Sequence, residues 1–150
     1  MDHKLTSLDE IKVIGIQART INNTAHIDIA QLWQKFYSEN IKDKIPNKIN
    51  DDILSLYTEY ESDYTKPYTV IIGCKVKDFS KIPEGMVSKI IPASKYAVFT
   101  AIGKMPDKIV ETWQNIWKSN LERTYTGDFE IYSEKYNLPE PEVDICIAIK

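Results

Sequence analysis

The segment Asp128-Phe129-Glu130-Ile131-Tyr132 places carboxylic acids and a phenol at a spacing that could do chemistry. Side chains alternate across a β-strand, so Asp128, Glu130 and Tyr132 share one face. Phe129 and Ile131 take the other. If these two pack under a helix, Glu130 and Tyr132 point to the opposite side, toward a cavity in a concave sheet. A solvent-exposed face, on which Glu is ordinary, fits the same pattern.

Aromatic residues make up 11% of the chain and could wall such a cavity. Several recur on the segments that a central cavity would touch: Trp33, Phe36, Tyr57, Trp113, Trp117 and Tyr132. Each of them alone is equally explained as core filling. Beside a buried carboxylate they would bind flat, lipophilic cations, because a ring within about 6 Å of a cation contributes roughly 0.5–2 kcal/mol. Burial should also raise the pKa of Glu130, so binding would weaken in acid.

Other site chemistries find no support in the sequence. There is no GxGxxG, P-loop, GxSxG or HExxH motif and no spaced Cys/His set, so we expect neither a cofactor nor a metal site. His3 and His26 are assigned no role. Cys74 and Cys146 both lie in β-like runs and are expected to be buried free thiols.

The gross composition is that of one globular domain. The chain has 150 residues, of which 43% are apolar and 27% charged, and this length can bury a sizeable core. A net charge of −3 does not favour direct nucleic-acid binding, which depends on Lys and Arg neutralising phosphates. No apolar run suits a signal peptide or a membrane span. We therefore expect a cytoplasmic protein with no membrane partner.

The first half of the chain predicts strand, helix, strand, strand. An alternating run over residues 11–19 indicates a core strand. A helix follows, with one apolar stripe of Ile29, Leu32, Trp33, Phe36 and Tyr37 and with Asp28 as its cap or first-turn acid. Residues 53–60 and 68–76 are two further strand-like runs.

The second half repeats this order after a turn-rich bridge over residues 78–85. Strand-like runs over 87–91 and 95–102 precede a helix that begins near Pro106 and carries Trp113 and Trp117. Strands over 128–132 and 143–149 close the chain. The two halves overlay as repeats of about 8–78 and 86–150 within a single domain, 1–150. On that overlay Ser55 corresponds to Glu130, so the symmetry breaks at this carboxylate.

Four stretches carry a resemblance to a known family: residues 89–99, which contain Pro92-Ala93-Ser94-Lys95-Tyr96-Ala97-Val98-Phe99, the helix with Trp113 and Trp117, the Asp128-Phe129-Glu130-Ile131-Tyr132 strand, and the ending 143–150. They resemble the gyrase-inhibitor-like small-molecule-binding domain, the effector-binding domain of AraC-type and MerR-type transcription activators, here in a stand-alone form. The resemblance implies an α+β fold, in which duplicated β-α-β-β units form a pseudo-two-fold antiparallel sheet with two main helices and a central cleft.

The resemblance also implies a ligand class. Members of the family bind amphipathic, often cationic, drugs, and the pocket acid of the Phe-Glu-x-Tyr strand is Glu130 here, with Tyr132 as the last residue of the motif. Many members carry an aromatic residue in the terminal strand where this chain has Cys146, with Ala148 two residues later. This position therefore implies a pocket that lacks one aromatic wall.

Three functions remain open on these grounds. The leading hypothesis is non-catalytic binding of a lipophilic, cationic small molecule for sensing, sequestration or drug tolerance. A second is a hydrolase of reactive small molecules with Glu130 as general acid or base, which Ser55 in place of a second acid argues against. A third is a protein-interaction role, such as inhibition of a topoisomerase, which would need a separate protein partner.

Overall fold

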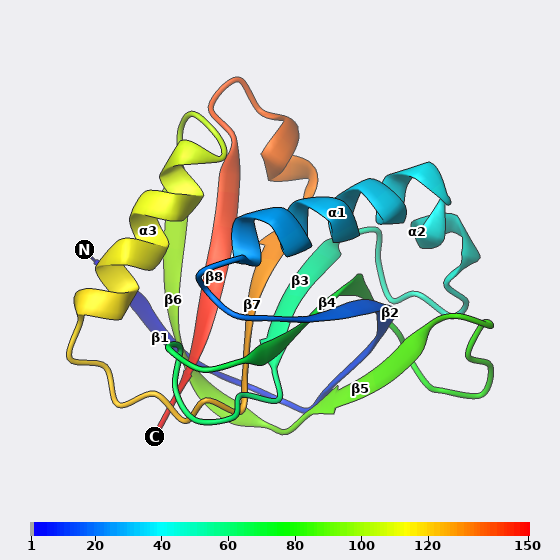
Figure 1. The fold of residues 1–150 in the computed structure, drawn as a ribbon, viewed down its shortest axis with the longest axis horizontal. Helices are drawn as coiled ribbons and strands as arrows, with labels where there is room; N and C mark the ends of the chain where they lie inside the picture. The colour runs from blue at the N-terminus through cyan, green and yellow to red at the C-terminus, as the bar shows by residue number, and fades with distance from the viewer. Residues whose placement is uncertain (1) are drawn as a thin grey trace.

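Eight strands form one antiparallel sheet, and the order of those strands contains a two-fold pattern. In the computed structural model, which describes residues 2–150, the sheet order is β1-β6-β8-β7-β3-β4-β2-β5. Exchanging β1–β4 for β5–β8 gives the same order read backwards. This is the pseudo-two-fold, α+β arrangement that the sequence predicted (Figure 1).

The strands and helices follow the predicted order closely. The first half contains β1 (Lys4–Leu8), β2 (Ile11–Thr20), α1 (Ala25–Ser38), α2 (Ile41–Lys44), β3 (Ile53–Thr58) and β4 (Tyr68–Lys75). The second half contains β5 (Val87–Ile91), β6 (Ser94–Ile102), α3 (Asp107–Lys118), β7 (Gly127–Tyr132), the 3₁₀ turn η1 (Glu134–Asn137) and β8 (Glu142–Ile149). The sequence analysis did not predict β1, α2 or η1.

The first strand of each half pairs with the other half. Strand β1 pairs with β6, and β5 pairs with β2, so both ends of the sheet join the two repeats. Four of the five residues of β1 are exposed, which is why no hydrophobic alternation announced it. The exact limits of the two repeats stay a prediction.

Apolar side chains cover both faces of the sheet. Figure 1 shows α1 and α3 on one face, where α1 covers Ile14, Val70 and Ile72, and α3 covers Phe99 and Ile145. The opposite face carries no helix. Its side chains form a third buried cluster: Ile11, Val13, Leu54, Leu56, Ile71, Ile91, Tyr96, Phe129, Cys146 and Ala148.

A pair of glycines brings β2 and β4 close together in the first half. Gly15 lies directly opposite Gly73, and a Cβ added to either residue would collide with the facing backbone, at Ile72 O or Ile14 O. Only glycine permits this approach.

No helix among residues 2–150 is long and apolar enough to cross a membrane.

Candidate ligand-binding site

The centre of the sheet, where the two halves meet, holds the carboxylate singled out from the sequence. Strands β3 and β7 pair with Ser55 opposite Glu130, and these are the residues that the overlay of the repeats made equivalent. Equivalent residues that face each other across an antiparallel pair lie on the symmetry axis. The two-fold pattern is therefore broken by a serine and a glutamate at its centre.

Three hydrogen-bond donors hold the Glu130 carboxylate, whose residue is only 3% exposed. The hydroxyl of Tyr57 and the Nε1–H of Trp113 donate to Oε2 at 2.9 and 2.6 Å. The hydroxyl of Tyr132 donates to Oε1 at 2.6 Å. Ser55 Oγ donates in turn to the Tyr57 hydroxyl at 3.3 Å. The donors come from β3, α3 and β7, so both halves of the chain fix the acid.

Burial and hydrogen bonding act on this acid in opposite directions. Burial raises the pKa of Glu130 above its ordinary value of 4.5, while the hydrogen bonds from Tyr132, Trp113 and Tyr57 act to lower it. Burial, followed by the nearby Glu130 charge, raises the pKa of both Tyr57 and Tyr132 well above 10, so both phenols stay neutral donors. Within residues 2–150, no Lys, Arg or His forms an ion pair with Glu130.

A cavity of about 480 Å³ opens above Glu130 between the two helices. This volume lies in the range of small-molecule sites. The cavity is lined by residues of α1, α3, the central strands and the loops that join these elements: Asn22, Ala25, His26, Ile29, Ala30, Trp33, Tyr57, Tyr60, Tyr64, Tyr68, Pro106, Ile109, Val110, Trp113, Trp117, Arg123, Glu130 and Tyr132.

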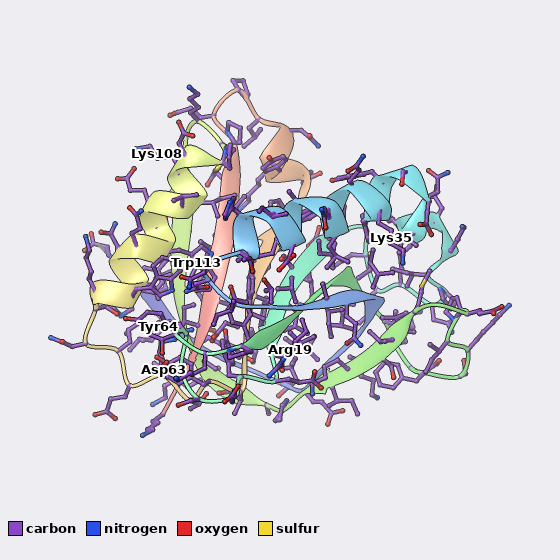
Figure 2. All side chains as sticks on the ribbon, viewed as in Figure 1. Arg19, Lys35, Asp63, Tyr64, Lys108 and Trp113 are labelled. Carbon is purple, nitrogen blue, oxygen red and sulfur yellow. The ribbon has the colours of Figure 1, made fainter. Side chains whose placement is uncertain are left out.

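The aromatic lining residues contact one another at ordered angles. Trp33 meets Tyr132 edge-to-face, with ring centroids 5.0 Å apart, and Trp117 stacks on Tyr64 at 5.8 Å. Trp113 lies edge-to-face with Tyr57 at 5.3 Å. Figure 2 shows Trp113 on the sheet-facing side of α3 and Tyr64 below it, near the C-terminal end of that helix. The rings thus form a connected wall that reaches from the acid to the β3–β4 loop.

A second polar group, Arg123 from the α3–β7 loop, lies at another part of the lining. Its Nη2 donates to Oδ2 of Asp128 at 2.8 Å, and the Tyr60 hydroxyl donates to the same oxygen at 2.6 Å. The backbone N–H of Ala148 donates to Oδ1 of Asp128 at 2.8 Å. Asp128, which shares the face of Glu130 on β7, is therefore fully engaged in a buried ion pair.

Six of the eight residues that the sequence analysis proposed for the site line this one cavity: Trp33, Tyr57, Trp113, Trp117, Glu130 and Tyr132. Phe36 does not line it. The ring of Phe36, 1% exposed, packs into the core between α1 and the sheet, one helical turn beyond Trp33.

Cys146 requires a clear correction. It lies opposite Phe129 in the β7–β8 pair, and its side chain belongs to the helix-free cluster on the far face of the sheet. An aromatic residue at this position would therefore not wall the cavity, so the expectation that Cys146 leaves the pocket without one aromatic wall was wrong. Both thiols are free and buried, and burial raises the pKa of Cys74 to about 11 and that of Cys146 to about 12.

The sequence left open which face of the central strand lies under the helices. Phe129 and Ile131 do not pack under a helix; they face the helix-free cluster. Glu130 and Tyr132 point toward the helices and line the cavity together with residues of α1 and α3.

Sequence reasoning missed several lining residues. Tyr60 and Tyr64 lie in the β3–β4 loop and Arg123 in the α3–β7 loop, where no periodicity marks an inward side chain. His26, which received no role, lines the cavity from the exposed first turn of α1. Within residues 2–150, no group of three or more His, Cys, Asp or Glu side chains is placed to hold a metal ion.

A family model described as Cass2, the integron-associated effector binding protein, matches residues 4–149. The chain belongs to this family. The resemblance to effector-binding domains of the gyrase-inhibitor-like type is thereby confirmed. The family is one of effector-binding proteins.

Two relatives are similar over nearly the whole chain. YobU of Bacillus subtilis (strain 168), described as a candidate transcriptional regulator, is 35% identical over 97% of this chain and 96% of its own length. The transcriptional regulator BrlR of Pseudomonas aeruginosa is 32% identical over 99% of this chain, but this chain spans only 61% of BrlR.

Two solved structures share the fold. An integron cassette protein from the Vibrio cholerae mobile metagenome has a TM-score of 0.76 at 28% identity, covering 99% of this chain and 95% of its own. SAV2435, solved bound to tetraphenylphosphonium, has a TM-score of 0.82 at 20% identity, covering 100% of this chain and 94% of its own.

Proposed function

We propose that this protein binds lipophilic monovalent cations in the cavity between α1 and α3, with Glu130 as the counter-charge. The observation that carries the proposal is a buried carboxylate that has three hydrogen-bond donors and no cationic partner among residues 2–150. Burying an unpaired charge is costly. A cationic ligand would remove that cost by supplying the missing charge.

The walls of the cavity fit the same ligand class. Trp33, Trp113, Trp117 and Tyr132 present ring surfaces around Glu130, and rings stabilise a cation through their negative faces. Tetraphenylphosphonium, the ligand of SAV2435, is a cation of this kind. The role that follows is sensing or sequestration of such compounds.

The composition of the lining favours binding over turnover. Glu130 is the one carboxylic acid among the lining residues, and Asp128 is engaged with Arg123. A hydrolase that works with a pair of carboxylic acids would need a second acid near Glu130. At the symmetry-related position the chain has Ser55, whose hydroxyl donates a hydrogen bond to the Tyr57 hydroxyl.

Titration calorimetry with tetraphenylphosphonium at pH 7.5 tests the proposal. We expect saturable binding of one cation per chain, accompanied by a change in tryptophan fluorescence because Trp33, Trp113 and Trp117 all line the site. A neutral aromatic compound of similar size, triphenylphosphine oxide, serves as the comparison. Absence of saturable binding, or equal affinity for the cation and the neutral compound, would refute the proposal.

A further inference from the structure

The cavity lining contains a guanidinium group whose hydrogen-bonding capacity is only partly used. The side chain of Arg123 is 5% exposed and lines the same cavity as Glu130. Its Nη2 donates to Asp128, but Nε and Nη1 are buried and have no hydrogen-bond partner among residues 2–150. Leaving buried donors unpaired destabilises the site, because they have lost water without gaining another acceptor, so an acceptor there would be held firmly.

The guanidinium is held in place from two sides. Asp128, itself 0% exposed, fixes one edge through the 2.8 Å ion pair. The ring of Tyr125 lies against its face, with the Arg123 Cζ atom 4.4 Å from the ring centroid. Because position and plane are both fixed, the one N–H of Nε and the two N–H of Nη1 have defined directions, as a recognition site requires.

The local charges specify the kind of acceptor. Asp128 already neutralises Arg123, so the cavity and its ion pair together carry the single negative charge of Glu130. A ligand with one positive charge and a neutral oxygen acceptor balances this site, whereas an added anion would leave an uncompensated charge in a buried place.

We infer that Arg123 is a specificity-determining residue: it receives a neutral oxygen acceptor, such as a carbonyl, at the end of the ligand remote from the cationic centre. This inference rests on the proposed function. Asp128 and Glu130 are two residues apart on one face of β7, which sets the cationic centre and the acceptor about 7 Å or more apart. Ligands of this site are therefore amphipathic monocations with an oxygen acceptor across an aromatic spacer.

The test compares two probes built on the same phosphonium core: (4-acetylphenyl)triphenylphosphonium and (4-isopropylphenyl)triphenylphosphonium. They have the same charge and nearly the same shape, but only the first has a carbonyl oxygen. We expect the wild-type protein to bind the acetyl compound about tenfold more tightly, the effect of one hydrogen bond to a charged donor. Equal affinities would overturn the inference.

Two variants assign the preference to the residue. Arg123→Lys keeps a cation beside Asp128 but loses the fork of donors, so the preference should fall to about twofold or less. Arg19→Lys makes the same substitution outside the cavity lining and should keep the full preference. A full preference in Arg123→Lys would overturn the inference. Thermal unfolding checks that both variants fold. If Arg123→Lys does not fold, the comparison of the two probes on the wild-type protein tests the inference by itself.

The outcomes also separate this inference from the proposed function. If neither probe nor tetraphenylphosphonium binds, the proposed function fails and the inference fails with it. If all three bind with equal affinity and depend on Glu130, the proposed function stands and only the role of Arg123 is rejected.

Discussion

Replacing Glu130 by Gln removes the proposed counter-charge while keeping the shape of the side chain. The amide oxygen can accept from Tyr57 and Trp113 as Oε2 does, and the amide nitrogen can donate to the oxygen of Tyr132. A cationic centre about 5–6 Å from the carboxylate, at an effective dielectric constant near 20, is attracted by about 3 kcal/mol. We therefore expect the affinity for tetraphenylphosphonium to fall about 100-fold in Glu130→Gln.

The stability of this variant provides an internal check. Because burial raises the folded-state pKa of Glu130, the ionised form destabilises the native state above that pKa, and the free energy of unfolding rises as pH falls through it. Glu130→Gln removes this cost, so at pH 7 its unfolding temperature without ligand should equal or exceed that of wild type. A loss of affinity would then not reflect misfolding.

The assay is titration calorimetry at pH 7.5 with tetraphenylphosphonium and with the neutral triphenylphosphine oxide. Glu134→Gln, an exposed residue of η1, changes the net charge equally and serves as the matched control. Glu134→Gln should bind the cation as wild type does. Glu130→Gln and wild type should bind the neutral compound with equal affinity. The charge-pairing argument is refuted if Glu130→Gln binds the cation within threefold of wild type.

Three further predictions concern pH and packing. Tetraphenylphosphonium itself does not titrate, so the pH dependence of its binding should report the ionisation of Glu130. Its dissociation constant should rise about tenfold per pH unit below the raised pKa of Glu130, with a midpoint above 4.5. Glu130→Gln should abolish this pH dependence, and a His26→Gln control should retain it. Trp113→Phe removes a donor that favours the ionised acid and should move the midpoint upward by about one unit in the same titration; an unchanged midpoint would contradict the hydrogen-bond argument. Cys146→Ala should lower the free energy of unfolding by about 1 kcal/mol in urea denaturation but leave the affinity within twofold, and a larger loss of affinity would place Cys146 at the cavity after all.

Much of the fold follows from apolar strand runs and helical spacing, because the central strands are buried on both faces and are therefore apolar over most of their length. The run over residues 11–19 and the stripe from Ile29 to Tyr37 predicted β2 and α1 nearly to their ends. The overlay of the repeats also predicted that Ser55 and Glu130 are equivalent, and the pairing of β3 with β7 places them opposite each other. Symmetry thus located the centre of the site before any contact was known.

The rest of the site depends on long-range arrangement that no local pattern records. Strand alternation predicts that the side chains of Glu130 and Phe129 face opposite sides of the sheet. It does not predict which side carries the helices. Cys146 was proposed for the cavity from the family resemblance, and its side chain lies on the other face of the sheet. Tyr60 and Arg123 lie in two different loops, and both contact the carboxylate of Asp128. No regular spacing in the sequence indicates that these three residues meet.

The measurement that tests the central claim most directly is a crystal structure of the complex with tetraphenylphosphonium. The proposed function predicts the phosphonium centre between α1 and α3, within about 6 Å of a Glu130 carboxylate oxygen and among the rings of Trp33 and Trp113. A cation bound elsewhere on the protein, or one in the cavity with Glu130 turned away from it, would contradict the account.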